Sequence, residues 1–203
     1  MITSHLKDDI RYITIDRTSK ANALTANMLD EMIEIAGVSN ENKALIITGS
    51  GKVFSAGADL DEVKKKDLAT STKWELLSDT IHRLSCVTIA AINGTVAGGA
   101  MGMVLACDIR ISVPEAYFFY PVMKLGYLPQ PSDALRLSKI CGSSRAKFIL
   151  LAGQKLTCKT AYEFGLVDEI VAGTNILSRI DELCLGISNS KRGQLSAIKE
   201  MIP

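Results

Sequence analysis

The sequence predicts an α/β fold with a sheet-containing N-terminal part and a helical C-terminal part. A strand, a turn of small residues and a helix follow one another twice, over residues 43–62 and again over residues 87–106. After residue 133 the apolar side chains recur at helical spacing. This order favours a single domain over residues 1–203, with a core over 1–140 and a helical segment over 141–203.

The individual elements follow from local patterns. Thr25 is placed to cap a helix that ends at Gly37, and residues 100–106 form a wholly apolar helix. Strands are predicted over residues 11–16, 43–48, 87–92, 108–112 and 116–119. Further helices are predicted over residues 71–84, 135–140, 143–151, 160–164, 176–187 and 194–201.

Composition limits the classes of partner. The chain has 203 residues, 47% hydrophobic and 22% charged, which is ordinary for a soluble domain. Its net charge of +1 gives no broad field for a polyanion, so we expect no nucleic-acid partner. The apolar stretch from Val87 to Cys107 contains several glycines and predicts strand, turn and buried helix, so we expect no membrane partner. Five cysteines without metal-ligand spacing favour free thiols in a reducing cytoplasm and no metal site.

Two turns of small residues each lead from a strand into a helix. The first is Ala56-Gly57-Ala58, after which Asp59 is placed to cap a helix beginning at Leu60, and the second is Gly98-Gly99. Small residues let another molecule approach the backbone, and a helix N-terminus presents unpaired N–H groups. If the turns face each other, one N–H from each can converge on a single oxygen, as in an oxyanion hole. The alternative for each turn is close packing of helix on strand.

Several motifs resemble the enoyl-CoA hydratase/isomerase (crotonase) family. Phe54-Ser-Ala-Gly-Ala-Asp-Leu60 resembles the first oxyanion motif of that family, and Ile89-Ala-Ala-Ile-Asn-Gly-Thr-Val-Ala-Gly-Gly99 resembles the second. Further matches are Ala106-Cys-Asp108, Ser19-Lys-Ala-Asn-Ala-Leu24, Lys124-Leu-Gly126 with Arg136-Leu137, and Thr160-Ala-Tyr-Glu-Phe-Gly-Leu-Val-Asp168. The resemblance covers nearly the whole chain in family order. It implies a crotonase-like spiral of ββα units, here with a shortened helical C-terminal segment.

The resemblance also implies a function. The substrate would be an acyl-CoA thioester, with CoA part of the substrate and no separate cofactor. The backbone amides of Ala58 and Gly99 would hold the thioester carbonyl oxygen and stabilise an enolate at the α-carbon. The residues matched to the CoA site are Ala56, Ala58, Asp59, Leu60 and, beside the thioester, Gly98. A homotrimer or a hexamer made of two trimers is the assembly that the family leads us to expect.

Three positions depart from the family pattern. Hydration in the family uses two glutamates, but the matching positions here are Gly102 and Val122, and Gln130 stands where some isomerases carry a carboxylate. None of these side chains can exchange a proton near neutral pH. Ordinary hydratase activity is therefore not expected.

Other polar groups near these positions are candidates for chemistry. Asp133 is the best of the titratable ones, with capping of the following helix as its alternative, and Tyr120 or Tyr127 could donate a hydrogen bond to the acyl group. The two histidines show no Ser–His–Asp spacing, which argues against hydrolysis by a triad. The lysines at 64–66 could reach CoA phosphates, but a solvated helix face explains them better.

Two classes of function remain open from the sequence. One is an enzyme that stabilises a thioester enolate, such as an acyl-CoA decarboxylase or isomerase. The other is a non-catalytic acyl-CoA-binding paralogue that keeps the fold. The chain ends at Pro203, before the further helices that cover the CoA site in the family, so we expect a more open pocket or one covered differently by a neighbour.

Overall fold

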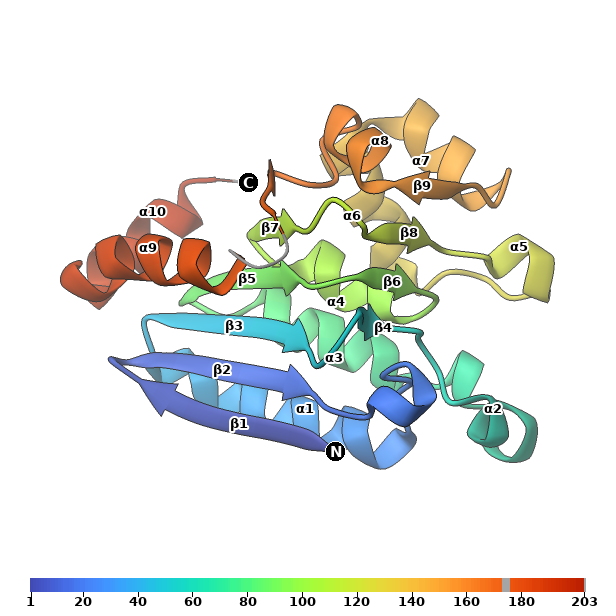
Figure 1. The fold of residues 1–203 in the computed structure, drawn as a ribbon, viewed down its shortest axis with the longest axis horizontal. Coiled ribbons are helices and arrows are strands. Elements are labelled where there is room, and N and C mark those ends of the chain that lie inside the picture. Colours follow the sequence, from blue (N-terminus) through green and yellow to red (C-terminus); the bar gives the residue numbers. More distant parts are fainter. Residues whose placement is uncertain (173–175, 203) are drawn as a thin grey trace.

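A computed structural model describes residues 1–172 and 176–202 and places their strands in two sheets (Figure 1). The larger sheet has six strands in the order β1-β2-β3-β5-β7-β10, of which only β1 is antiparallel to its neighbour. Its members are β1 (Ile2–Lys7), β2 (Ile10–Ile15), β3 (Ala44–Gly49), β5 (Val87–Ile92), β7 (Ile109–Ser112) and β10 (Glu169–Ile170). The central strands β3 and β5 are almost wholly buried, as expected of a parallel sheet covered on both faces.

The smaller sheet has four short strands in the order β4-β6-β8-β9. They are β4 (Val53–Ser55), β6 (Thr95–Ala97), β8 (Tyr117–Phe119) and β9 (Lys155–Thr157). The chain passes three times from a strand of the large sheet to one of the small sheet and then into a helix, namely α2 (Leu60–Lys66), α4 (Ala100–Ala106) and α5 (Val122–Leu125). This repeated strand–strand–helix passage confirms the predicted α/β spiral of ββα units.

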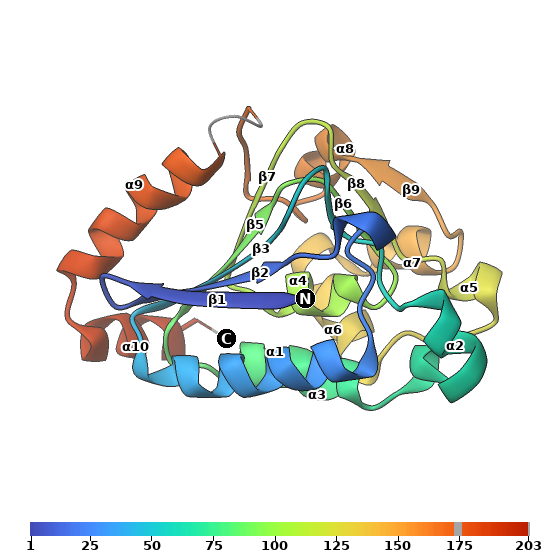
Figure 2. The ribbon, with the colours of Figure 1, turned by 60° about the horizontal axis from the view of Figure 1, so that its bottom comes forward.

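On one face of the large sheet, α1 (Ala26–Val38) and α3 (Lys73–His82) lie side by side (Figure 2). The predicted cap of α1 is present, because the Thr25 side chain accepts a hydrogen bond from the Met28 amide. Short 3-10 turns complete the connections at η1 (Thr18–Lys20), η2 (Ser39–Glu41) and η3 (Leu68–Thr70).

The C-terminal part is richer in strand than predicted. Its helices are α6 (Pro131–Cys141), α7 (Ser143–Leu150), α8 (Cys158–Glu163), α9 (Ile176–Asn189) and α10 (Arg192–Glu200). Between them β9 pairs with β8 and β10 pairs with β7, so the segment over 141–203 is not purely helical. Both strands are very short, with three and two residues, so neither has enough residues to show a periodic pattern.

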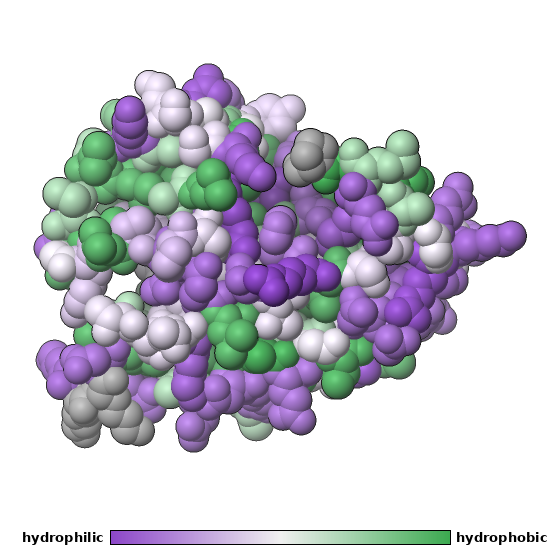
Figure 3. Space-filling model, turned by 180° about the vertical axis from the view of Figure 1, so that it is seen from behind, coloured by the Kyte–Doolittle hydropathy of each residue, from purple (hydrophilic) through white to green (hydrophobic). Residues whose placement is uncertain are grey.

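The first strand was also missed. Only its first residue is buried, because β1 is an edge strand whose other side chains are exposed. Asp8 and Asp9 form the turn into β2 with positive φ angles. All five cysteines are free and buried, as predicted. Seen from behind, hydrophobic side chains gather on the side that carries α5 and α7 (Figure 3).

Candidate active site

A cavity of about 300 Å³ opens where the parallel strands of the small sheet end. β4, β6 and β8 run in the same direction, so the residues that follow each of them meet at one edge. Those residues are Ala56–Ala58, Gly98–Gly99 and Tyr120–Val122, and all three segments contribute to the wall. The remaining lining is largely apolar and comes from Leu60, Val63, Ala69, Trp74, Ala97, Phe119, Leu125, Tyr127, Leu128 and Gln130.

The two small-residue turns face each other across this edge. A Cβ built on Gly57 would lie 2.7 Å from the Ala97 carbonyl oxygen and 3.3 Å from the Gly99 amide nitrogen. A Cβ built on Gly98 would lie 3.8 Å from the Gly57 Cα. Both glycines have positive φ, which disfavours any other residue. The condition that the sequence left open, that the turns face each other, is met.

The amides of Ala58 and Gly99 are both available to a ligand. Leu24 lies opposite Ala58 but forms its hydrogen bonds with the residues on either side of it. The Leu24 amide donates to the Gly57 carbonyl, and the Asp59 amide donates to the Leu24 carbonyl. Within residues 1–172 and 176–202 no group accepts a hydrogen bond from either the Ala58 or the Gly99 amide. A partly buried N–H without a partner is unusual, and two of them here line one cavity.

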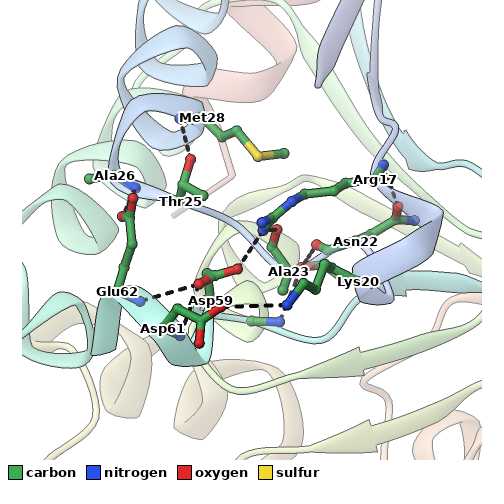
Figure 4. Close-up of polar contacts among 12 residues, drawn as sticks. Arg17, Lys20, Asn22, Ala23, Thr25, Ala26, Met28, Asp59, Asp61 and Glu62 are labelled. Carbon is green, nitrogen blue, oxygen red and sulfur yellow. Dashed lines mark hydrogen bonds and ion pairs between the residues drawn. The ribbon is translucent and has the colours of Figure 1, made fainter. Parts of the chain in front are cut away.

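The first turn is held by buried polar groups (Figure 4). The Asn22 side chain donates to the carbonyls of Ser50 and Val53, and the Ser55 hydroxyl donates to the Asn22 carbonyl. Arg17 forms an ion pair of 2.6 Å with Asp59, whose other oxygen accepts from the first amides of α2. The Arg17 guanidinium holds the pKa of Asp59 below its usual range.

The second turn is held by packing. The Gly98 amide donates to the Phe119 carbonyl at 2.9 Å, which ties the turn to the end of β8. A Cβ on Gly99 would lie 2.7 Å from the ring of Trp74, so the indole covers this residue directly. Trp74 itself is fixed by a hydrogen bond from its ring nitrogen to the Leu68 carbonyl.

A sequence profile of the enoyl-CoA hydratase/isomerase family matches residues 5–202. The chain belongs to the enoyl-CoA hydratase/isomerase family. Its relatives include the short-chain-enoyl-CoA hydratase of Clostridium acetobutylicum, 32% identical over 182 residues (86% of this chain, 70% of the relative). Another is 4-chlorobenzoyl coenzyme A dehalogenase-2 of an Arthrobacter species, 34% identical over 187 residues (87% and 68%). The crystal structure of enoyl-CoA hydratase from Bacillus anthracis matches with a TM-score of 0.92 at 27% identity, covering 99% of this chain and 81% of that one.

The residues that the family resemblance matched to CoA lie in two different settings. Ala56, Leu60 and Gly98 line the cavity, and Leu60 is 73% exposed. The Asp59 side chain is buried and paired with Arg17, and it caps α2 and fixes the turn. Lys64 is exposed on α2, whereas the side chains of residues 65 and 66 lie outside what the structure describes.

Two of the three departures from the family pattern line the cavity, and the third lies beside a buried carboxylate. Val122 and Gln130 line the cavity, and Gly102 lies in α4 one turn beyond Gly99. A Cβ built on Gly102 would lie 2.8 Å from Oδ1 of Asp133. The space that a side chain at position 102 would fill is therefore occupied by the carboxylate of Asp133, which comes from α6.

Asp133 does not cap α6, contrary to the alternative that the sequence left open. The N-cap is Gln130, and Asp133 is the third residue of the helix. Its side chain is fully buried, and its Oδ2 accepts a hydrogen bond of 2.6 Å from the Tyr120 hydroxyl. Burial raises the pKa of Asp133 to about 6, against the opposing hydrogen bond from Tyr120. Burial and the neighbouring Asp133 raise the pKa of Tyr120, which stays protonated.

Sequence reasoning missed several wall residues. Trp74, Val63 and Leu128 approach the cavity from three separate segments, and nothing in their local pattern distinguishes them from packing residues. Metal chemistry has no evident site, because the described parts of the chain contain no group of three or more His, Cys, Asp or Glu side chains able to hold an ion. Nor, among those parts, is any helix both long and apolar enough to cross a bilayer.

Proposed function

We propose that this protein is an acyl-CoA enzyme that stabilises a thioester enolate between the backbone amides of Ala58 and Gly99. The observation that carries the proposal is the pair of amides without hydrogen-bond partners, on two facing turns at one apolar cavity. Membership of the enoyl-CoA hydratase/isomerase family supports a thioester substrate. CoA is then part of the substrate, and no further cofactor is needed.

The chemistry follows from where charge develops. When the α-carbon of a thioester loses a proton, or loses its carboxylate group as CO₂, the bonding electron pair stays behind and the negative charge moves to the carbonyl oxygen. Two N–H groups already directed at that oxygen stabilise the charged state more than the neutral one. Losing one such donor costs on the order of 2.7–4 kcal/mol of transition-state stabilisation in other enzymes. The apolar lining of this cavity strengthens the effect because it lowers the local dielectric constant.

Addition of water is not the reaction we propose. Hydration needs an acid and a base at two places, and the wall at Val122 is apolar. At position 102, the other of the two, the only carboxylate described beside the glycine is that of Asp133. Isomerisation or decarboxylation of an acyl thioester requires the enolate but no second carboxylate, so these reactions fit the site better. Binding without any product would instead favour a non-catalytic paralogue.

Trp74 provides the test, because it is the only tryptophan and lies against Gly99. Titration with butyryl-CoA is expected to give a saturable change in its fluorescence, and free CoA a weaker one. Hydration of crotonyl-CoA, followed by absorbance, is expected to be slow in the same preparation. No saturable change with any acyl-CoA would overturn the thioester site, and turnover at the rate of an ordinary hydratase would overturn the reaction class.

Gly57→Ala tests whether the facing turns matter. The new methyl group would meet the Ala97 carbonyl at 2.7 Å and force the turns apart, so turnover of any substrate should fall by roughly 10²–10³-fold. The matched control is Gly37→Ala in α1, where a Cβ meets nothing within 4 Å and which should gain up to about 1 kcal/mol of stability. Equal activity in both variants would contradict the proposal.

We also propose that the protein is cytoplasmic and that it assembles as a homotrimer or as a pair of trimers. Five free, buried cysteines support a reducing compartment. A patch of exposed apolar side chains on the face of α5 to α7 supports assembly with further copies. It contains Met123, Leu125, Leu128, Leu135, Phe148 and Leu151. Light scattering of the purified protein tests this, and a monomer at micromolar concentration would contradict it.

A further inference from the structure

Asp133 is a buried carboxylate that the packing of the fold does not explain. It is fully buried, and its Oδ1 accepts no hydrogen bond from any residue in the described parts of the chain. Each buried polar atom without a partner costs stability, on the order of 1–3 kcal/mol. A carboxylate kept in this state calls for a role other than stabilisation.

The neighbouring helix leaves space for this carboxylate. Gly102 presents only hydrogen toward Asp133, and a Cβ there would lie 2.8 Å from Oδ1 and 3.0 Å from Oδ2. Gly102 follows Gly99 by three residues in α4, a rise of about 4.5 Å along the helix axis. Gly102, against which the carboxylate packs, thus lies one helical turn from the residue whose amide we assign to the thioester oxygen.

Tyr120 connects this carboxylate to the cavity. It is the first residue after β8 and lines the cavity, although only 3% of its surface is exposed. Its hydroxyl donates to Asp133 at 2.6 Å and receives a long contact of 3.4 Å from the Gln130 amide. The hydroxyl thus has one neighbour, the Asp133 carboxylate, that can take its proton, and it belongs to a residue of the cavity wall.

Two other charged groups, Glu75 and Arg136, have opposite effects on the pKa of Asp133. Glu75 on α3 accepts a hydrogen bond from the Ser132 amide, and its charge favours the protonated form of Asp133. Arg136 on α6 favours the ionised form, but it is already bound to Asp79 and Ser78. Neither compensates for burial, so the carboxyl group can change protonation near neutral pH.

We propose that Tyr120 and Asp133 form the proton-transfer pair of this site, with Tyr120 exchanging a proton with the α-carbon of the bound acyl thioester. The inference rests on the proposed function. As the α C–H bond breaks, its electron pair moves into the enolate held by Ala58 and Gly99. The proton goes to the Tyr120 oxygen, while the original Tyr120 proton passes to Asp133. The reverse transfer returns a proton to the α-carbon, so no further reactant is consumed. Tyr120 is the catalytic residue and Asp133 the positioning residue that stores the proton.

The experiment follows exchange of the α-hydrogens of butyryl-CoA with D₂O by mass spectrometry. The wild-type protein is expected to incorporate deuterium. Tyr120→Phe and Asp133→Asn are each expected to slow incorporation by about 10²–10⁴-fold, while the Trp74 fluorescence midpoint changes by only a few-fold. The double variant is expected to be no slower than either single variant, because the two groups act in series.

Matched controls come from a second tyrosine–aspartate contact in the same chain. Tyr12 on β2 donates to Asp181 on α9 at 3.4 Å, outside the cavity. Tyr12→Phe and Asp181→Asn remove the same groups and are expected to leave the exchange rate unchanged.

The pH profile separates proton transfer from a structural role. Exchange needs ionised Asp133, so its rate in the wild-type protein is expected to rise through about pH 6 and then level off. Asp133→Asn should lose this inflection in its residual rate. Binding of butyryl-CoA without exchange by the wild-type protein, or exchange that persists in both variants, would overturn the pair while leaving the thioester site standing. A lack of binding would overturn the proposed function itself.

Discussion

Asp59 and Asp133 are two buried aspartates in the first turns of two helices beside one cavity, yet their surroundings differ. Asp59 caps α2, is paired with Arg17 at 2.6 Å and accepts from two backbone amides. Asp133 lies in the third position of α6, accepts one hydrogen bond from Tyr120 and keeps one oxygen without a partner. The pKa of the first is lowered and that of the second is raised to about 6.

The difference shows that partners, and not burial alone, decide what a buried carboxylate does. A full set of donors and a cation fix Asp59 as an ion, which suits a group that holds a turn in place. Asp133 has no direct ion pair, since the nearby Arg136 is bound to Asp79, and it can take or release a proton near neutral pH, which suits a group that takes part in chemistry. The two aspartates are therefore expected to respond differently to substitution and to pH.

The largest expected difference is in activity. Asp133→Asn should slow α-hydrogen exchange by about 10²–10⁴-fold, whereas Asp59→Asn, which still accepts from the α2 amides, should stay within about tenfold of the wild-type rate. Initial rates at saturating butyryl-CoA measure this. Equal losses in both variants would mean that the two aspartates do not differ in role.

For stability the order of the two variants should be reversed, with the larger loss in Asp59→Asn. Asp59→Asn weakens a charged, largely buried contact with Arg17, so we expect the free energy of unfolding to fall by about 1.5–3 kcal/mol. Asp133→Asn removes the cost of a buried charge and should not lower it. Urea unfolding at neutral pH provides the measurement. A large destabilisation by Asp133→Asn would favour a structural role for that carboxylate.

The pH dependence of stability separates the two aspartates further. The folded-state pKa of Asp59 is lowered, so its stabilisation is present above about pH 4 and is lost as the pH falls. The folded-state pKa of Asp133 is raised, so its contribution is lost as the pH rises from about 4 to about 6. Relative to the wild type, Asp133→Asn should therefore gain stability over this range, by about 3 kcal/mol at most. A gain that does not depend on pH would contradict the raised pKa.

The smallest expected effect is that of Glu75→Gln on the pH midpoint of exchange. Its negative charge helps to raise the pKa of Asp133, so Glu75→Gln should shift the midpoint of the exchange profile to lower pH. The glutamine can still accept from the Ser132 amide. Glu31→Gln, an exposed change on α1, is the control and should leave the midpoint in place. A shift to higher pH in Glu75→Gln would show that the environment of Asp133 is misjudged.

Local signals in the sequence were enough for most of the fold. The repeated strand–turn–helix unit, the cap at Thr25 and the cap at Asp59 depend on patterns within a few residues, and the structure confirms them. The spiral of ββα units was implied by the family resemblance instead. The strands β1 and β9 escaped because their side chains are mostly exposed. Those strands exist through pairing with partners rather than through their own periodicity.

The site was predictable only in part. Both turns are contiguous motifs, so their small residues stand out in the sequence. The contact between Gly102 and Asp133 joins residues 31 positions apart from two helices, and only the packing of α4 on α6 brings them together. Considered alone, Gly102 indicated a lost carboxylate. The structure adds that the carboxylate of Asp133 lies where a side chain at position 102 would begin.

Carbon NMR can report whether the amides of Ala58 and Gly99 hold a thioester carbonyl. Butyryl-CoA labelled with ¹³C at the carbonyl is bound to the protein, and the carbonyl resonance is compared with that of free butyryl-CoA. Two hydrogen bonds to the oxygen polarise the C=O bond, so the bound resonance is expected to move downfield, and less so in Gly57→Ala than in Gly37→Ala. A bound carbonyl that resonates at the position of free butyryl-CoA would contradict the account.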